Sequence, residues 1–307
     1  MSGNILSIDI GGSKTVIGIV DTQGNIVCSH KTFLPEKYDA EYLINHIYLE
    51  SKQYMEYYPI AVGVTIPGLC NSQKGVWCYA PFSGISDFPI STVLREKLGL
   101  EVYIENDVNA CAIAEKRYGA CKDDKSFLWV TVSNGIGGAI YLDGKLYTGE
   151  SGNAGEIGHF IVEENTHELC GCGRYGCLEA MASGKGIENE YANVTGTRVD
   201  AKTLAKLAKN GDNVSMEIFN KAGRYIGKAL SYSINLLNIN KVVLGGGVSQ
   251  SFELFNRGIK DSLDKYLFSQ ANRILTIEKT YLGYNAAIIG AAAVAIINIS
   301  NKENSYV

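Results

Sequence analysis

The sequence has no long hydrophobic run. Its most apolar segment, AAIIGAAAVAI from Ala286, is well short of the ~18 residues that a membrane span needs, so we expect a buried helix there and no membrane partner. The N-terminal stretch MSGNILSIDIGG lacks the basic segment, apolar run and small-residue cleavage site of a signal peptide. These absences predict a cytoplasmic protein, in whose reducing environment the eight cysteines would not form a disulfide framework.

Excess positive charge is missing as well. With 28 basic and 32 acidic residues the formal net charge is −4, whereas a protein that binds nucleic acid needs a basic surface to contact phosphates. We therefore expect no nucleic-acid partner. A hydrophobic fraction of 46% is ordinary for a soluble globular enzyme, and 307 residues suffice for two lobes or one large α/β domain.

A pattern of strands and glycine turns occurs twice. The segments ILSIDIGGSKTVIGIVDTQGNIV and, from Phe127, FLWVTVSNGIGGAIYLDGKLY each predict strand, turn, strand and turn. Further strands are predicted at residues 60–66, 101–107 and 241–247, and helices at 40–57, 108–118, 184–191, 201–209, 213–238 and 251–266. Alternating strands and helices indicate an α/β protein, and the repeated unit suggests two related lobes.

Three glycine-rich turns follow apolar strands: DIGGSK from Asp9, SNGIGGA from Ser133 and GGGVSQ from Gly245. Because glycine allows backbone N–H groups to approach an anion closely, the three turns together could hold the phosphates and sugar of a nucleotide. Each one alone is more often a tight hairpin. They match neither the phosphate-loop motif nor the dinucleotide fingerprint, whose third glycine is replaced here by Ile140.

Two aspartates lie at the ends of predicted strands. Asp9 precedes the first glycine turn, where it could hold Mg²⁺ beside a phosphate or simply cap the turn. Asn106 and Asp107 lie where a strand passes into a helix. Asp107 could be the helix N-cap, or it could accept a proton from a hydroxyl while Asn106 donates and accepts hydrogen bonds with a polyol.

Three cysteines and a histidine lie close together in the sequence. His159 ends the glycine-rich segment GNAGEIGHF, and CGCGRYGC brings Cys170, Cys172 and Cys177 within eight residues. A Cys₃His set suits tetrahedral Zn²⁺, which would be structural because protein atoms fill all four positions. The alternative is a structural histidine beside reduced thiols, since C-x-C-x₄-C is not a standard finger spacing.

These motifs together resemble the ROK family of sugar kinases and repressors over nearly the whole chain. DIGGSK resembles the family's phosphate loop, ENDVNACAIAE its catalytic segment and SNGIGGAIYLDGKLYTGESGNAGEIGH its signature. CGCGRYGCLE resembles its zinc motif, LGGGVSQ its adenosine-side loop and NAAIIGAAAVA its closing helix.

The resemblance implies a role for each matching residue. Asp107 would be the catalytic base. The implied sugar-binding residues are Gly68, Asn106, Asp107, Glu156, His159 and Glu179. The implied zinc ligands are His159, Cys170, Cys172 and Cys177, and zinc would fix the loop that presents the sugar-binding groups. Nucleotide and Mg²⁺ would be bound by Asp9, Gly11, Gly12, Ser13, Lys14, Asn134, Gly135, Gly137, Gly138, Gly246 and Gly247.

The implied fold is α/β: a two-lobed, actin-like ATPase (ribonuclease H-like) fold with duplicated βββαβα lobes. Residues 1–106 would form the small lobe, to which a helix at about residues 285–303 returns, and residues 107–284 the large lobe. The lobes would close on the sugar and exclude water.

The resemblance also implies a function. It would be ATP-dependent phosphorylation of a hexose at its C6 hydroxyl, with glucokinase first among the candidates. A kinase for N-acetylmannosamine, N-acetylglucosamine, allose or fructose is the nearer alternative, and a sugar-sensing regulator without turnover the more distant one. Family repressors carry a DNA-binding module before the first phosphate loop, which here begins at residue 9. A homodimer or homotetramer is expected.

Overall fold

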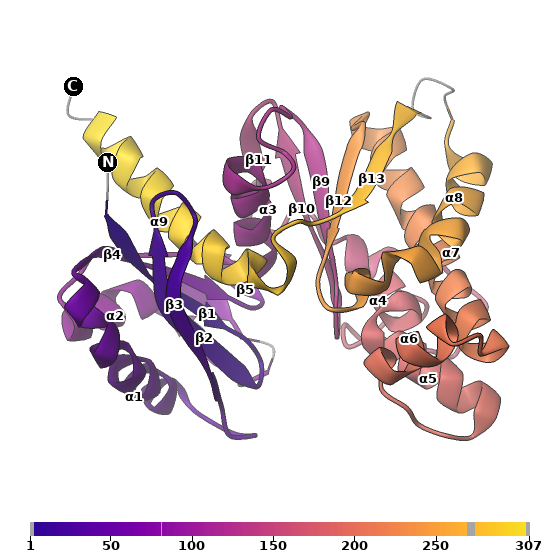
Figure 1. Ribbon diagram of the computed structural model, residues 1–307, viewed down its shortest axis with the longest axis horizontal. Helices are drawn as coiled ribbons and strands as arrows, with labels where there is room; N and C mark the ends of the chain where they lie inside the picture. The colour runs from indigo at the N-terminus through magenta and orange to yellow at the C-terminus, as the bar shows by residue number, and fades with distance from the viewer. Residues whose placement is uncertain (1–2, 81, 269–273, 305–307) are drawn as a thin grey trace. The chain divides into compact units, whose positions relative to one another are not determined.

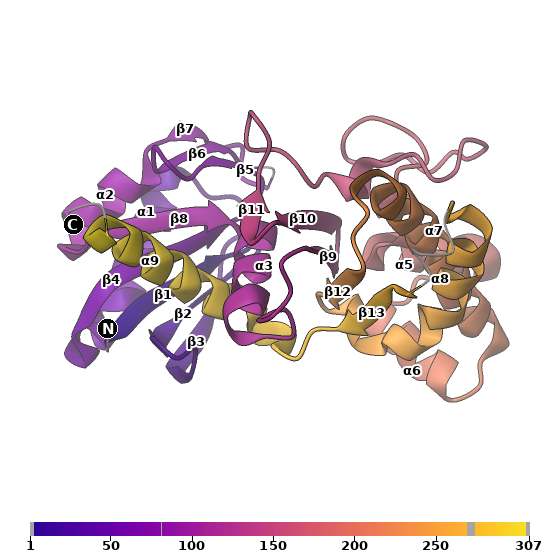
Figure 2. The same cartoon turned by 90° about the horizontal axis from the view of Figure 1, so that it is seen from above.

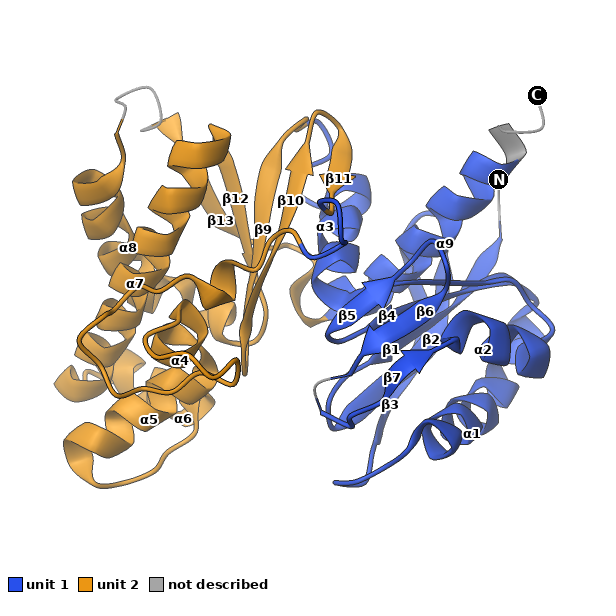
Figure 3. Cartoon of the chain, turned by 180° about the vertical axis from the view of Figure 1, so that it is seen from behind, with its two compact units in different colours: residues 1–123, 149–153, 285–307 blue, residues 124–148, 154–284 orange. Residues whose placement is uncertain are grey.

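The computed structural model describes residues 3–80, 82–268 and 274–304. The chain forms two compact units, which Figure 3 shows in blue (unit 1) and orange (unit 2). Unit 1 comprises residues 1–123, 149–153 and 285–307, and unit 2 comprises residues 124–148 and 154–284. Each unit therefore combines segments that are distant in the sequence.

Unit 1 is built on a five-stranded sheet of order β3-β2-β1-β4-β8. Its strands are β1 (Asn4–Ile10), β2 (Lys14–Asp21), β3 (Ile26–Phe33), β4 (Pro59–Ile66) and β8 (Val102–Asn106). Alternate residues of β1, namely Leu6, Ile8 and Ile10, pack in one apolar cluster with residues of α1 (Ala40–Ser51) and α2 (Ile90–Leu98). A small sheet of β5 (Leu69–Asn71), β6 (Val76–Tyr79) and β7 (Ser86–Phe88) completes this side.

The opposite face of this sheet is covered by α9 (Ala286–Asn304), with α3 (Asp107–Tyr118) packed against that helix (Figure 1). The helices and the sheet approach closely because glycines remove side chains at the contacts. A Cβ at Gly63 would meet the backbone oxygen of Ala291, and a Cβ at Gly290 would lie 2.5 Å from that of Ala110.

Unit 2 repeats the strand order of unit 1, as β11-β10-β9-β12-β13. Its strands are β9 (Phe127–Val132), β10 (Ile136–Leu142), β11 (Lys145–Tyr147), β12 (Lys241–Gly245) and β13 (Thr276–Lys279). Its helices are α4 (Leu178–Ala182), α5 (Gly184–Thr195), α6 (Ala201–Lys209), α7 (Asn213–Leu237) and α8 (Phe252–Tyr266), of which α7 and α8 lie side by side (Figure 2). In both units the first three strands are antiparallel and the last two parallel, which confirms the predicted α/β class and the duplication.

Short 3₁₀ helices fill the remaining regular structure: η1 (Lys52–Tyr57), η2 (Ile157–His159), η3 (Val248–Ser251) and η5 (Gly283–Asn285). The helix predicted over residues 40–57 is α-helical only to Ser51 and continues as η1. The predicted lobe boundary at residue 106 also differs from the observed division, which keeps α3 in unit 1 because α3 packs on α9.

Among the described residues, one helix is long and apolar enough to cross a membrane by length and composition alone. It spans Gly283–Lys302, which is longer than the apolar run that the sequence analysis considered. Of its apolar window, 56% is buried inside the protein, as is typical of a core helix.

Candidate functional site

The junction between β8 and α3 presents Asn106 and Asp107. Asn106 is the N-cap of α3: its side-chain oxygen accepts hydrogen bonds from the backbone N–H of Val108 (2.9 Å) and Asn109 (3.1 Å). Asp107 is the first helical residue, so the cap is the residue before the one that the sequence suggested. Because both lone pairs of the Asn106 oxygen are used within the protein, Asn106 can only donate a hydrogen bond to a ligand.

The carboxyl group of Asp107 titrates near neutrality. Burial raises its pKa to about 7, and the negative charge of nearby Asp9 adds to the rise. Burial also raises the pKa of Asp9, which accepts a hydrogen bond from Thr65 Oγ1 at 2.8 Å. A carboxylate with a pKa close to 7 is suited to take a proton from a hydroxyl and release it again, and two neighbouring carboxylates can attract Mg²⁺.

A buried glutamate that the sequence analysis did not select holds this junction. Glu105 is 8% exposed, and its Oε1 accepts hydrogen bonds from Asn106 N (3.0 Å) and Asn109 Nδ2 (3.1 Å). The thiol of Cys70 on β5 also points at Glu105 Oε1 (3.8 Å). Asn106 Nδ2 in turn donates to the carbonyl of Gly68 at 3.0 Å, and Val108 N donates to the side-chain oxygens of both Asn106 and Asp107.

Unit 2 brings together the four predicted metal ligands. The ligand atoms of His159, Cys170, Cys172 and Cys177 all lie within 4.8 Å of one another. Cys172 Sγ is 3.6 Å from Cys177 Sγ, and Cys170 Sγ is 3.6 Å from His159 Nδ1. The loop reaches this arrangement through a hydrogen bond from Cys170 N to the carbonyl of Arg174 at 2.8 Å.

These separations fit a tetrahedral zinc site. With a Zn–S bond of about 2.3 Å and a Zn–N bond of about 2.0–2.1 Å, tetrahedral geometry places ligand atoms roughly 3.6–3.8 Å apart. Both 3.6 Å distances agree with that geometry. The donor set of three thiols and one imidazole is also the one that zinc prefers.

The predicted sugar-binding groups of unit 2 surround this cluster. His159 Nε2 lies 3.7 Å from Glu156 Oε2, so the two ring nitrogens face different partners and one histidine can serve both predicted roles. Glu179 on α4 comes two residues after Cys177. Its Oε2 accepts a hydrogen bond from Ile136 N at 3.0 Å, and its Oε1 lies 3.7 Å from Cys170 Sγ.

The first glycine turn lies in unit 1 between β1 and β2. Gly11 N donates to Lys14 O at 2.8 Å, which closes the turn, and Ser13 O accepts from Leu34 N at 2.9 Å. A Cβ at Gly12 would lie 2.8 Å from the Phe82 ring. Only glycine fits at this position without moving Phe82.

The other two glycine turns meet in unit 2. A cavity of about 480 Å³ is lined by Asn134 from the β9–β10 turn and by Gly247 after β12, together with residues of α5 and α6 and Tyr284. A Cβ at Gly246, whose φ is +88°, would lie 2.5 Å from the carbonyl oxygen of Val132, so the backbones of the two turns approach closely there. Gly135, Gly137 and Gly138 do not line the cavity. A Cβ at Gly135 would collide with Glu179 Oε2, so that glycine lies against Glu179 instead.

This cavity also contains a polar group without a partner. Gln250 lines it, and Gln250 Nε2 is buried with no hydrogen-bond partner among the described residues. A buried donor left unpaired costs about 1–3 kcal/mol; because Gln250 Nε2 is closed off from solvent, a ligand could pair with it only after the side chain turns toward the cavity.

Paired α/β units of equal strand order define the two-lobed, actin-like ATPase fold. The ROK family matches residues 5–297, and the chain belongs to that family.

The relatives include both kinases and repressors. The glucokinase of Streptomyces coelicolor is 29% identical over 314 residues, covering 95% of this chain and 98% of the relative. The N-acetylglucosamine repressor of Escherichia coli O157:H7 is 28% identical over 299 residues, covering 92% of this chain but 73% of the repressor.

A similar solved structure is the ROK family glucokinase from Streptomyces griseus in complex with glucose and AMPPNP. Its TM-score is 0.83 at 30% identity, with 94% of this chain and 98% of that chain covered.

Proposed function

We propose that this protein is an ATP-dependent hexose kinase that phosphorylates the C6 hydroxyl, with glucose as the first candidate sugar. The observation that carries the proposal is the carboxyl group of Asp107, presented on the first turn of α3 with a pKa of about 7. This chain matches two relatives named as glucokinases over 98% and 96% of their length, which supports the same class of reaction here.

In this proposal Asp107 takes the proton from the C6 hydroxyl of the sugar. The hydroxyl oxygen attacks the γ-phosphorus of ATP, and ADP leaves. Proton removal by a positioned base contributes typically ~10²–10⁴-fold to the rate. Asp9, which lies close to Asp107, would help to hold Mg²⁺. Mg²⁺ and the backbone amides of the glycine turns would offset the negative charge of the transferring phosphoryl group.

The sugar hydroxyls would be recognised by two carboxylates and by uncharged hydrogen-bonding groups. Glu156, His159 and Glu179 offer acceptors or a donor near the cysteine cluster. Asn106 offers a donor, and its hydrogen bond to the Gly68 carbonyl holds Gly68 close to Asp107. Carboxylates that accept from hydroxyls are the usual means of binding a polyol.

Zinc bound by His159, Cys170, Cys172 and Cys177 would supply structure only, since four protein ligands leave no position for substrate. The chain's own part is to place Glu179 two residues after Cys177 and to orient His159 through Nδ1.

The nucleotide base is proposed to occupy the cavity of unit 2. Asn134, Gly247 and Gln250 line it, with the exposed ring of Tyr284 available for stacking. Gln250 Nε2 would supply a donor to a purine nitrogen once its side chain turns toward the cavity.

A second candidate function is a sugar-sensing regulator without turnover, which the repressors among the relatives favour. Two features of the chain support the kinase instead: Asp107 is present with a pKa suited to catalysis, and the cavity offers space for a nucleotide. The cytoplasmic location and a homo-oligomeric state stay predictions from the sequence.

A hexose panel assayed with Mg·ATP tests the proposal. The panel contains glucose, fructose, allose, N-acetylglucosamine and N-acetylmannosamine, and the readout is sugar-dependent release of ADP. We expect turnover with at least one hexose and its loss in Asp107→Asn. Tight sugar binding by calorimetry, with no ADP formed from ATP in the presence of any of the sugars, would support the regulator.

A further inference from the structure

A second cavity in unit 2 lies away from the cavity with the glycine turns. It has a volume of about 340 Å³ and is walled by α7, by α8 and by Val162 and Glu163. The α7 residues that line it are Lys221, Arg224, Tyr225 and Lys228, and those of α8 are Asp261, Ser262, Lys265 and Tyr266. The spacing of three and four residues on α7 places its members on one helix face.

Two of the lysines make cation–π contacts with the same aromatic ring. Lys265 Nζ lies 5.0 Å from the centre of the Tyr266 ring, and Lys228 Nζ lies 5.8 Å from it. Lys228 also donates a hydrogen bond to the carbonyl of Val162 at 2.7 Å. Within the described part of the chain, neither ammonium has a carboxylate at ion-pair distance. Two cations at one ring without a counterion favour the binding of an anion between them.

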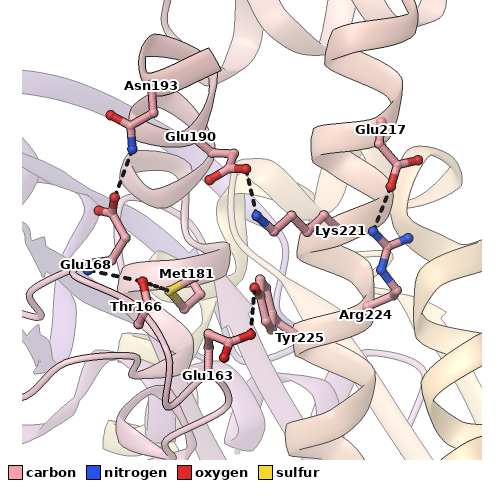
Figure 4. A network of polar contacts seen from close by, with 10 residues as sticks. All are labelled: Glu163, Thr166, Glu168, Met181, Glu190, Asn193, Glu217, Lys221, Arg224 and Tyr225. Atoms are coloured by element: carbon pink, nitrogen blue, oxygen red, sulfur yellow. Dashed lines mark hydrogen bonds and ion pairs between the residues drawn. The ribbon is translucent and has the colours of Figure 1, made fainter.

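The other two cations of the cavity are already neutralised, as Figure 4 shows. Lys221 pairs with Glu190 at 2.7 Å, and Arg224 pairs with Glu217 at 2.6 Å. Neither of these glutamates lines the cavity.

Two acids do line the cavity and oppose an anion. One of them, Glu163, accepts a hydrogen bond from Tyr225 Oη at 3.4 Å, and the other is Asp261 on α8. Since Lys221 and Arg224 are paired with glutamates outside the cavity, the two cations without an ion pair among the described residues, Lys228 and Lys265, equal in number the two acids that line it.

We propose that this cavity binds a small phosphate monoester. The dianionic phosphate would accept hydrogen bonds from Lys228 and Lys265, whose two charges match its own. The rings of Tyr225 and Tyr266 would contact the carbon skeleton of the ligand, and about 340 Å³ suffices for a compact monophosphate. This site is separate from the groups assigned to sugar and nucleotide, so it stands independently of the proposed kinase activity.

The cavity wall is joined to the metal loop. Val162 N donates to the carbonyl of Gly176 at 2.9 Å, and Gly176 precedes the predicted ligand Cys177. The carbonyl of Val162 accepts the hydrogen bond from Lys228. A ligand bound to Lys228 is therefore connected, through Val162 and Gly176, to the loop that carries the predicted metal ligands.

Isothermal calorimetry with the full-length protein tests the site, using glucose 1-phosphate and inorganic phosphate as probes. AMPPNP is kept saturating so that phosphate groups of the probes do not occupy the nucleotide site. We expect glucose 1-phosphate to bind in the micromolar to low millimolar range and at least threefold more tightly than inorganic phosphate. Lys228→Gln and Lys265→Gln should each weaken it by roughly tenfold or more.

Lys260→Gln is the matched control, because Lys260 is an exposed lysine of α8 that does not line the cavity. It should bind like wild type, and Lys228→Arg should restore most of the affinity lost in Lys228→Gln. Unchanged melting temperatures show that the variants are folded. The proposal is overturned if glucose 1-phosphate does not bind, if it binds no better than phosphate, or if Lys260→Gln weakens it as much as Lys265→Gln.

Discussion

Asp107 shares its surroundings with Asp9, and this determines how its charge responds to pH. With a pKa of about 7, Asp107 is largely protonated at pH 6 and largely ionised at pH 8. Only the ionised form can take a proton, so kcat/KM should rise about tenfold per pH unit below pH 7 and level off above it. A pH–rate profile from pH 5.5 to 9 measures this. A profile flat below pH 7 would show that no group with this pKa acts in the reaction.

Replacement of Asp107 by Asn should separate activity from stability. The amide cannot take a proton, so kcat should fall by at least ~10²-fold. The folded-state pKa lies above the usual 3.8, so ionising Asp107 costs stability as pH rises from about 4 to 7, and the variant avoids this cost. After allowance for solvent screening, Asp107→Asn should be about 1–2 kcal/mol more stable than wild type at pH 8 and equal to it near pH 4. Urea unfolding at both pH values checks this; a less stable variant at pH 8 would contradict it.

Glu105 should act as a positioning residue. Glu105→Ala would leave the buried Asn106 N–H and Asn109 amide without their acceptor, at a cost of about 1–3 kcal/mol each. We expect kcat to fall at least tenfold while the KM for ATP changes little. Glu105→Gln keeps an acceptor oxygen and should recover most of the activity. If Gln were as inactive as Ala at equal stability, the charge of Glu105 would matter rather than its hydrogen bonds.

Single residues could be predicted from the sequence where their chemistry is local. Asp107 is recognisable because a strand end, an asparagine and a helix start are adjacent in the sequence, and the cysteines because they lie within eight residues. Glu105 could not be, since its function depends on burial beside Cys70 and Asn109 on other elements. Its position directly before Asn106 was the available signal.

At the scale of elements, the loop between η2 and α4 is predicted to depend on its metal. Cys172→Ser removes one of four ligands, so the purified protein should contain well under one zinc per chain and the KM for sugar should rise roughly ten- to a hundredfold. ATP affinity should stay within about threefold, because the cavity proposed for the nucleotide is lined by other residues.

Cys78→Ser is a suitable control for this change, as Cys78 lies on β6 in unit 1 and outside the cluster. Elemental analysis and calorimetry give both quantities. Wild-type protein with almost no zinc and full activity would contradict the metal assignment.

Among the elements that the sequence analysis did not predict are α2, α4, β5, β6, β7 and β13, and two of them show different reasons. Helix α2 carries buried Ile90, Leu94 and Leu98 at a spacing of four and ends at Gly99 in the left-handed region, so its signals were present but only nine residues long. Among the described strands β13 pairs only with β12, and it is partly exposed along its length. Four residues with this pattern carry too little periodicity to identify an edge strand.

At the scale of the whole molecule, the duplication was predictable and the extent of each unit was not. The repeated strand and turn pattern indicated two similar halves, and both sheets have the same order. The assignment of α3 to unit 1 depends on its contact with α9, which lies more than 150 residues later in the chain. No local pattern reports such a contact.

Removal of the C-terminal helix should therefore unfold unit 1 selectively. In a chain ending at Tyr284, the buried faces of β1, β4 and α3 that α9 covers would be exposed to water, and at about 25 cal/mol per Å² this loss exceeds ordinary domain stability. Hydrogen exchange should show lost protection in residues 4–118 and retained protection in β9, β12 and α7. Retained protection of β1 and β4 would contradict this role of α9.

The late position of α9 also sets the order in which the protein can fold during its synthesis. The ribosome finishes all strands of unit 1 by Asn106, yet must add residues 124–284 before α9 emerges. At about 5–20 residues per second, this takes roughly 10–30 s. Unit 2 is complete first, although its sequence comes second, and the N-terminal sheet waits with one apolar face uncovered. That face is where a nascent chain of this protein would need a chaperone.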